Sequence, residues 1–348
     1  MRAAVFVEPR RIQVTDRPDP VIRESTDAIV RVALACVCGS DLWFYRGETP
    51  FEPGPIGHEF IGVVEDVGSD VHNVKKGDFV ISPFAFSDGT CPHCRHGITT
   101  ACVHGGFFPT GNGDGGQGEA VRVPLADGTL VAVPGDGYSD ETMASLLALS
   151  DVMGTGEHAA VCARVKPGDT VAVVGDGAVG LCGVLAAKRH GAERVIALSR
   201  HPDRQQLGRE FGATDIVEAR GEEAIAAVLE LTGGVGVDAA LECVGTGQAM
   251  DTALGVVRPG SMVGYVGVPH GVELPVQSMF YGNKGVQGGP APARAYLPKL
   301  LDDVLEGRIN PGRVFDFVTD LDGIADAYAA MDERRAIKSL LRVGTVWP

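Results

Sequence analysis

The sequence predicts an α/β protein in two parts, one β-rich and the other a doubly wound parallel sheet. Up to about residue 135, short apolar runs are broken every few residues by Gly, Pro or Asp. From about residue 139, helix-like and strand-like segments alternate instead. The length of 348 residues suggests about two domains, and 45% hydrophobic residues are enough to build full-sized cores.

The β-rich part consists of short runs between turn residues, which favours an all-β barrel or sandwich. These runs are "AAVFV", "AIVRVAL", "IGVVEDVG", "DFVIS", "EAVRV" and "LVAVP". The glycine-rich stretch 111–118, "GNGDGGQG", predicts a loop at the surface.

Past residue 139 the elements alternate between helix and strand. Residues 139–165 suit a helix, with Ser139 or Asp140 as its cap and Glu141 in the first turn. The following segments are "TVAVV", "LCGVLAAKRHG", "RVIAL", "EEAIAAVLELT", "VDAALECVG", "GQAMDTALGVV" and "SMVGYVGVP". Strands and helices in alternation predict a parallel, doubly wound sheet. After about residue 288 we expect the helix "AYLPKLLDDVLEG", a strand "VFDFV", another helix and a closing "SLLRV".

The strongest single motif is the glycine-rich turn Gly175-Asp176-Gly177-Ala178-Val179-Gly180. It follows an apolar strand and opens an apolar helix, and in this setting G-x-G-x-x-G predicts a dinucleotide site. The first glycine makes the tight turn, the second lets the backbone approach a pyrophosphate, and the third allows close packing of helix and strand. The N-terminus of the helix then offers free N–H groups to the phosphates.

The end of the next strand distinguishes NAD from NADP. A NAD site normally places Asp or Glu there to bind the ribose hydroxyls. Here "RVIAL" runs into Ser199 and Arg200, and the only nearby acid, Asp203, lies in the following helix. The guanidinium of Arg200 suits a 2′-phosphate, while Ser199 adds a donor and Arg204 a further charge. The sequence therefore favours NADP, and a solvated surface arginine is the alternative interpretation of Arg200.

Composition excludes several classes of partner. The net charge is −15 and no Lys/Arg run occurs, so nucleic acid and anionic membranes are poor partners. No apolar stretch reaches the length of a membrane span, and the start "MRAAVFVEPRR" has no apolar signal region. We therefore expect a cytoplasmic protein, whose eight cysteines serve as thiols or metal ligands and not as disulfides.

Three residues spread along the chain supply the donors of a catalytic zinc site. They are Cys38 in "CGSD", His58 in "GHEF" and Asp151 in "LSDVMGTGEH". Each alone has an ordinary explanation, as a buried thiol, a core histidine or a capping aspartate. Together, a thiolate, an imidazole and a carboxylate with a fourth position left open are the pattern of catalytic zinc.

A second group of donors lies in the loop 91–102. Cys91, Cys94 and Cys102 are close in sequence, but a closed structural zinc site needs four ligands. His93 and His96 are further donors in the same loop.

From end to end the chain resembles the zinc-dependent medium-chain alcohol dehydrogenases of the medium-chain dehydrogenase/reductase superfamily. The resemblance lies in "CGSD" at 38–41, "GHEF" at 57–60, "GDFV" at 77–80, "CPHCRHG" at 91–97, "TGEHAA" at 155–160, "GDGAVG" at 175–180 and "VGVP" at 266–269. It implies a GroES-like β-barrel catalytic domain from residues 1–150, completed by 288–348. A Rossmann domain of residues 151–287 is inserted, and the protein is expected to be a homodimer or homotetramer.

The resemblance also implies roles for particular residues. Cys38, His58 and Asp151 would bind the catalytic zinc, with Glu59 close to the metal and Ser40 bonded to the substrate hydroxyl. Residues implied at the cofactor, beyond the glycine motif and the strand tip, are Thr155, Val244, Val268 and Lys338. In the cysteine loop Asp88 would be the fourth ligand beside Cys91, Cys94 and Cys102, which gives a closed structural site; a degenerate lobe without metal is the alternative.

The implied reaction is hydride transfer between an alcohol, or its aldehyde or ketone, and NADP(H), with Ser40 taking the hydroxyl proton. Many relatives continue this proton relay with a histidine where this chain has Trp43, and an indole cannot accept a proton. The relay must then run through cofactor ribose hydroxyls or water. Bulky apolar candidates for the substrate pocket are Trp43, Phe84, Phe86 and Met153.

Two other functions remain open from the sequence. One is a zinc-free quinone or enone reductase of the same superfamily, and the other is a non-catalytic dinucleotide-binding protein with a structural or sensing role. The presence of Cys38, Ser40, His58 and Asp151 favours the zinc enzyme over both.

Overall fold

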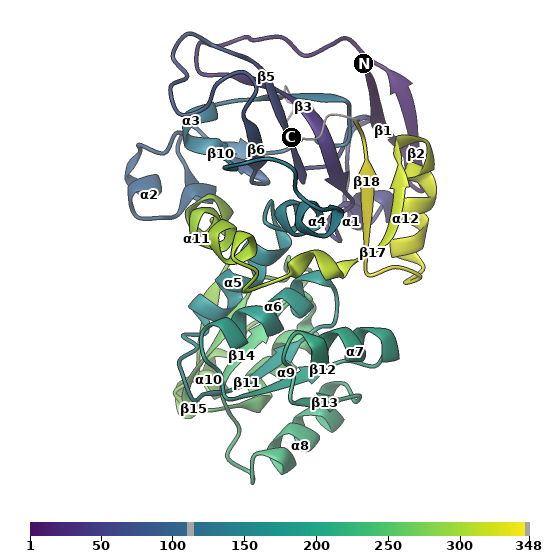
Figure 1. Cartoon of the computed structure of the whole chain (residues 1–348). Helices are drawn as coiled ribbons and strands as arrows, with labels where there is room; N and C mark the ends of the chain where they lie inside the picture. The colour runs from purple at the N-terminus through teal and green to yellow at the C-terminus, as the bar shows by residue number, and fades with distance from the viewer. Residues whose placement is uncertain (110–114, 345–348) are drawn as a thin grey trace. The chain divides into compact units, whose positions relative to one another are not determined.

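A computed structural model describes residues 1–109 and 115–344 (Figure 1). The chain divides into two compact units, Met1–Asp151 with Pro292–Pro348, and Val152–Ala291. No helix in the described ranges is long and apolar enough to cross a lipid bilayer.

The first unit is built on β-sheets. A seven-stranded sheet has the order β10-β6-β5-β3-β18-β17, with β9 also paired to β3; the other two sheets are β2-β1-β4 and β7-β8. The strands are β1 (Arg2–Glu8), β2 (Arg11–Asp16), β3 (Ala28–Cys36), β4 (Gly54–Pro55), β5 (Phe60–Val67), β6 (Phe79–Ser82), β7 (Ala85–Phe86), β8 (Gly106–Phe107), β9 (Ala120–Val123), β10 (Val131–Ala132), β17 (Phe315–Asp320) and β18 (Lys338–Arg342).

Strand β3 is the centre of the large sheet. It pairs with β5 along one edge, and with β9 and then β18 along the other. Eight of its nine residues are buried, which explains why "AIVRVALAC" is apolar almost throughout and does not alternate. Strands β17 and β18 come from the C-terminal end of the chain and lie beside the N-terminal β3 (Figure 1).

Short helices cover this unit. They are α1 (Asp41–Arg46), α2 (Pro92–Arg95), α3 (Ala126–Thr129), α4 (Asp140–Ala148), α11 (Ala293–Leu305) and α12 (Ile324–Asp332), with 3₁₀ turns η1 (Thr99–Ala101), η2 (Pro311–Val314) and η3 (Leu321–Gly323). Helix α12 buries Ile324, Ala327, Tyr328 and Met331 in the core. This spacing of three and four residues places the four side chains on one face of the helix.

The second unit contains a six-stranded parallel sheet in the order β13-β12-β11-β14-β15-β16. Its strands are β11 (Thr170–Val174), β12 (Arg194–Leu198), β13 (Asp215–Val217), β14 (Val237–Glu242), β15 (Val257–Tyr265) and β16 (Gly285–Gly288). Its helices are α5 (Val152–Cys162), α6 (Ala178–Arg189), α7 (Pro202–Glu210), α8 (Gly221–Leu231), α9 (Gly247–Val256) and α10 (Val276–Gly282). This strand order is that of a Rossmann sheet, whose direction of winding reverses between β11 and β14. The predicted doubly wound sheet is confirmed.

The helical segment 139–165 departs from the expectation of a helix along its whole length. Ser139 caps α4 and accepts a hydrogen bond from the N–H of Thr142, as predicted, but α4 ends at Ala148 and α5 begins at Val152. In the break, the hydroxyl of Ser150 donates to the carbonyl of Leu147 at 2.7 Å. Such local bonds compete with helical ones.

The glycine-rich stretch 111–118 is only partly described, because residues 110–114 lie outside the described ranges. Residues 115–118 are buried, so the prediction of a surface loop is wrong for that half. Gly115 packs against the backbone of Ile56, where an added Cβ would lie 2.2 Å from its carbonyl oxygen. Glycine is needed there because two backbone segments approach closely.

Candidate active site

Four potential metal ligands meet in the first unit. Cys38 follows β3, His58 and Glu59 immediately precede β5, and Asp151 lies in the break between α4 and α5. All four are buried, and one ligand atom from each lies within 4.8 Å of the others. The break between the two helices therefore places the carboxylate of Asp151 beside Cys38 and His58, which lie at the ends of the neighbouring strands β3 and β5.

The distances in this cluster suit a single ion. The Sγ of Cys38 lies 3.8 Å from Oδ2 of Asp151, and Nε2 of His58 lies 3.4 Å from the same oxygen. A thiolate, an imidazole and a carboxylate are all zinc ligands. The second carboxylate oxygen of Glu59, Oε2, is buried and has no hydrogen-bond partner among the described residues. A buried carboxylate oxygen without a hydrogen-bond partner fits a site that holds a cation.

Electrostatics in the cluster depend on burial and on close charges. Burial raises the pKa of the Cys38 thiol, while the His58 imidazole beside it acts in the opposite direction. Burial lowers the pKa of His58, but the Asp41 carboxylate and the Cys38 thiol outweigh that effect and raise it well above its ordinary value. These shifts describe the metal-free residues.

Asp41 is a member of the site that sequence reasoning missed. Its Oδ1 lies 3.4 Å from Nδ1 of His58, and its Oδ2 accepts a hydrogen bond from the N–H of Cys38 at 3.0 Å. The contact at Nδ1 leaves Nε2 directed at the cluster, as a carboxylate behind a metal-bound histidine does. The buried side chains of Gln117 and Tyr328 hold Asp41 from behind. The sequence signal for it is the aspartate of "CGSD", three residues after the predicted ligand Cys38.

Lys338 is not available to a cofactor, which corrects the expectation from the resemblance. Its side chain is 1% exposed and donates from Nζ to Oε1 of Glu59 at 2.6 Å and to the carbonyl of Val37 at 3.1 Å. Lys338 is the first residue of β18, and its direction from that strand carries the ammonium into the core of the first unit. Its role is to offset the buried charge of Glu59.

The residues predicted to lie near the substrate differ in their contacts and burial. The hydroxyl of Ser40 lies 3.2 Å from Sγ of Cys38, at the start of α1. The ring of Phe84 lies 6.3 Å from the ring of His58 and stacks on Phe107, a residue that the sequence did not single out. Trp43 is half-buried in α1.

The other two pocket candidates are placed differently. Phe86 packs edge-on against Phe108 of the core, and Met153 is fully buried in α5 of the second unit. Met153, at 0% exposure, presents no surface to a substrate, whereas Phe86 is half-buried and its place in the substrate pocket stays a prediction.

The second group of donors also converges. One ligand atom from each of Asp88, Cys91, Cys94 and Cys102 lies within 4.8 Å of the others. Oδ1 of Asp88 accepts hydrogen bonds from the N–H groups of Thr90 and Cys91. Three cysteine thiols and one carboxylate, each a known type of zinc ligand, fit a closed four-coordinate zinc site.

His104 adds a contact to this lobe that sequence reasoning missed. Its Nδ1 lies 2.6 Å from Oδ2 of Asp88. Burial favours the protonated acid, but hydrogen bonds from the Cys91 N–H and from His104 hold the pKa of Asp88 well below its ordinary value. The hydrogen bond from the Cys94 backbone lowers the pKa of Cys91 to about 7, so both groups ionise readily. His96 bonds instead to the carbonyl of Pro92 at 2.7 Å.

The glycine motif has the predicted geometry. Gly175 has φ of +116°, and a Cβ at Gly180 would lie 2.0 Å from the carbonyl oxygen of Gly175. Gly177 caps α6, and a Cβ there would meet no heavy atom within 4 Å. The space before the N-terminus of this twelve-residue helix, which begins with Ala178 and Val179, is therefore open, and the turn fits a phosphate.

At the tip of β12 the structure corrects the expectation about which acidic residues lie nearby. Asp203 is not the only nearby acid, because the carboxylate of Asp176 reaches the same place from the glycine motif. Its Oδ2 accepts the hydroxyl of Ser199 at 2.9 Å, and its Oδ1 lies 3.3 Å from the guanidinium of Arg204. Arg200 is exposed. The glycine motif therefore places the carboxylate of Asp176 at the tip of β12, where the strand itself ends without an acidic residue.

The remaining cofactor candidates all belong to the second unit. Thr155 is 8% exposed in α5. Val244 follows β14 and is 42% exposed, and its N–H donates to Glu242. Val268 follows β15 and is 53% exposed. The last two therefore lie past the carboxyl ends of neighbouring parallel strands, where ligands of such sheets bind.

Comparison with known proteins decides the family. A model described as "Alcohol dehydrogenase GroES-like domain" matches residues 24–135, and one described as "Zinc-binding dehydrogenase" matches residues 178–306. The zinc-type alcohol dehydrogenase B of Aspergillus flavus is 33% identical over 99% of this chain and 82% of its own length. The chain belongs to the zinc-dependent medium-chain alcohol dehydrogenases.

Two further comparisons agree with this. The NADP-dependent isopropanol dehydrogenase of Thermoanaerobacter brockii is 32% identical over 88% of this chain and 90% of its own length. The structure of the alcohol dehydrogenase from Thermus sp. ATN1 matches with a TM-score of 0.91 and 34% identity, over 99% of this chain and 100% of the other. The dehydrogenase is a zinc-dependent oxidoreductase with a GroES-like part and a Rossmann-type sheet, as the resemblance implied.

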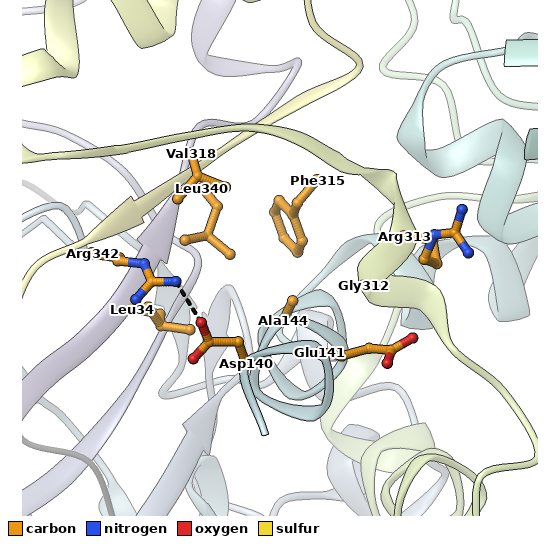
Figure 2. A pocket seen from close by; sticks show the side chains of 10 residues that line it. All are labelled: Leu34, Asp140, Glu141, Ala144, Gly312, Arg313, Phe315, Val318, Leu340 and Arg342. Carbon is orange, nitrogen blue, oxygen red and sulfur yellow. Dashed lines mark hydrogen bonds and ion pairs between the residues drawn. The ribbon is translucent and has the colours of Figure 1, made fainter. Parts of the chain in front are cut away.

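The first unit of the dehydrogenase also has a cavity of about 260 Å³, whose lining does not include Cys38, His58 or Asp151. Figure 2 shows its apolar side chains, and the ion pair between Arg342 and Asp140 at 2.7 Å. It is lined by Leu34, Asp140, Glu141, Ala144, Gly312, Arg313, Phe315, Val318, Leu340 and Arg342. None of these is one of the predicted site residues.

Proposed function

We propose that this dehydrogenase transfers hydride between a primary or secondary alcohol, or the corresponding aldehyde or ketone, and NADP(H). The proposal rests on one observation above others, the convergence of Cys38, His58 and Asp151. The same chain carries a dinucleotide turn at residues 175–180 with an open helix N-terminus. A cation site and a hydride-carrier site in one chain are what this reaction requires.

Each residue of the cluster has a role in the proposal. Cys38, His58 and Asp151 hold the zinc, and Asp41 fixes the ring of His58. Zinc, when bound, supplies a Lewis acid that makes an alcohol hydroxyl more acidic. Ser40, whose hydroxyl is 3.2 Å from Sγ of Cys38, accepts the proton that the alcohol loses. Because the indole of Trp43 cannot take that proton further, it passes to a cofactor ribose hydroxyl or to water.

We propose NADP as the preferred cofactor and NAD as a second one. Arg200 is exposed at the tip of β12, and its guanidinium suits a 2′-phosphate. The Thermoanaerobacter brockii relative, which is NADP-dependent by name, supports this choice.

The test is a panel of alcohols and carbonyl compounds assayed with both cofactors. We expect zinc-dependent turnover of small or medium hydrophobic alcohols, at a lower KM for NADP than for NAD. Arg200→Ala should raise the KM for NADP by roughly ten- to hundredfold, the size of one charge-assisted contact, and leave that for NAD unchanged. Arg209→Ala, at the far end of α7, is the control. Metal-independent reduction of quinones or enones would instead indicate the zinc-free reductase, and cofactor binding with no turnover would indicate the sensor.

We propose that Asp88, Cys91, Cys94 and Cys102 hold a second, structural zinc. Fully loaded protein should then contain about two zinc ions per chain. Cys94→Ser should lower the thermal midpoint clearly and the turnover number of the surviving enzyme little, because a closed site cannot bind substrate. A content near one zinc, unchanged by Cys94→Ser, would show an empty lobe. Elemental analysis and thermal denaturation provide both readouts.

We infer that the dehydrogenase assembles as a homodimer, or as a homotetramer of two such dimers. Strand β16 is an edge of its sheet. Helix α10 beside β15 exposes Val276, Phe280 and Tyr281 by 68%, 75% and 77%. An open strand edge next to exposed apolar side chains suits a second copy of the same surface. Four of the eight cysteines are proposed here as metal ligands, and thiols used in this way suit a reducing compartment such as the cytoplasm.

A further inference from the structure

A carboxylate lies inside the phosphate-binding turn of the second unit. Asp176 is the second residue of the glycine motif, and it contacts Ser199 at 2.9 Å and Arg204 at 3.3 Å. The side chains of Asp176 and Arg204 are only 19% and 13% exposed, and Ser199 is 4% exposed. These three residues form a largely buried cluster at the carboxyl ends of β11 and β12.

The cluster changes what its members offer to a ligand. A serine hydroxyl has one hydrogen, and that of Ser199 is directed at Asp176, so its free lone pairs suit a ribose hydroxyl and not a phosphate oxygen. The positive charge of Arg204 is offset by the same carboxylate. Ser199 and Arg204 both contact the carboxylate of Asp176. A 2′-phosphate that bound to either residue would have to come close to that negative charge. Arg200 remains as the exposed cation of this strand tip.

We propose that Asp176 is a cofactor-selectivity residue. Its carboxylate accepts a hydrogen bond from the adenosine ribose of NAD and repels the 2′-phosphate of NADP. The acid that other NAD sites have at the end of the second strand is here supplied by the glycine turn. This inference rests on the proposed dehydrogenase function, and it implies that Asp176 works against Arg200, so that the chain accepts both cofactors.

The test compares two fragments that differ only in the 2′-phosphate, 5′-AMP and adenosine 2′,5′-bisphosphate. Asp176→Asn keeps the shape and an acceptor oxygen for Ser199 but removes the charge. Calorimetric titration of the full chain without alcohol should show the bisphosphate binding roughly tenfold or more tightly to the variant than to the wild type. Binding of 5′-AMP should be unchanged or weaker. The KM ratio of NAD to NADP should rise in parallel.

Asp203→Asn is the matched control, because it removes the same charge from an exposed position in the first turn of α7. The two affinities should keep their ratio within about twofold in this control, since exposed charges are strongly screened. Asp176→Ser serves as a second variant if Asp176→Asn does not fold. The inference is overturned if removing the Asp176 charge changes both fragments by one factor, or no more than Asp203→Asn does. A wild-type chain that binds neither NAD nor NADP would overturn the proposed function itself.

Discussion

Cys38→Ala should reduce alcohol turnover by more than about 100-fold, while the protein stays folded and keeps its affinity for the cofactor. Loss of an outer partner of a zinc ligand already costs up to about that factor, and Cys38 is proposed as a direct ligand. The cofactor turn lies in the other unit of the chain, with its own core, so its binding should not change. Steady-state kinetics, metal analysis and cofactor titration measure the three quantities.

Cys162→Ala is the control for this result, because it removes another buried thiol far along the chain, in α5. Asp151→Ala tests the third ligand. It should reduce zinc content and turnover together, as Cys38→Ala does. Unchanged turnover in Asp151→Ala would show that Asp151 is not the third ligand, and Glu59, whose Oε1 lies 4.0 Å from Nε2 of His58, would be the next residue to test.

Lys338→Met should destabilise the first unit by about 3–5 kcal/mol, the cost of leaving one partner of a buried ion pair alone. The side chains of Lys338 and Glu59 are 1% and 0% exposed, and they bond at 2.6 Å. Without the ammonium, Oε1 of Glu59 loses its closest ion pair and keeps only the more distant imidazole of His58, 4.0 Å away, among the ion pairs of the described residues. Urea denaturation of metal-free protein measures the free energy of unfolding.

Two variants identify the cause of that loss. Glu59→Gln combined with Lys338→Met should recover most of the stability, because no unpaired charge remains. Lys75→Met removes an ammonium from the pair with Asp78, where Lys75 is 83% exposed, and should cost at most about 1 kcal/mol. If the double variant is no more stable than Lys338→Met, lost packing and not the unpaired charge explains the effect.

Local patterns predicted the elements well. The tight turn at Gly175, the close packing at Gly180 and the cap at Ser139 follow rules that operate within one turn of chain, and the structure confirms these three. The break at residues 149–151, where the hydroxyl of Ser150 bonds to the carbonyl of Leu147, was not predicted. That break carries Asp151, so the sequence identified the residue without explaining how it reaches His58.

Local sequence patterns could not predict contacts between residues that are far apart along the chain. Lys338 and Glu59 are 279 residues apart, and the side of β18 from which the lysine emerges is set by the register of the sheet. Asp176 stands at a position of the motif that accepts any residue, and its partner Ser199 is 23 residues away. Reasoning from each strand tip alone therefore missed the acid.

The order of segments along the chain has a consequence for synthesis on the ribosome. Strand β3 emerges early, but one of its edges is covered by β18, whose residues are translated only after the whole dinucleotide unit. Residues 152–291 form one continuous segment and can fold while elongation continues. Until residues 338–342 emerge, the nascent barrel has an open strand edge and an uncompensated Glu59. The segment made first is thus completed last.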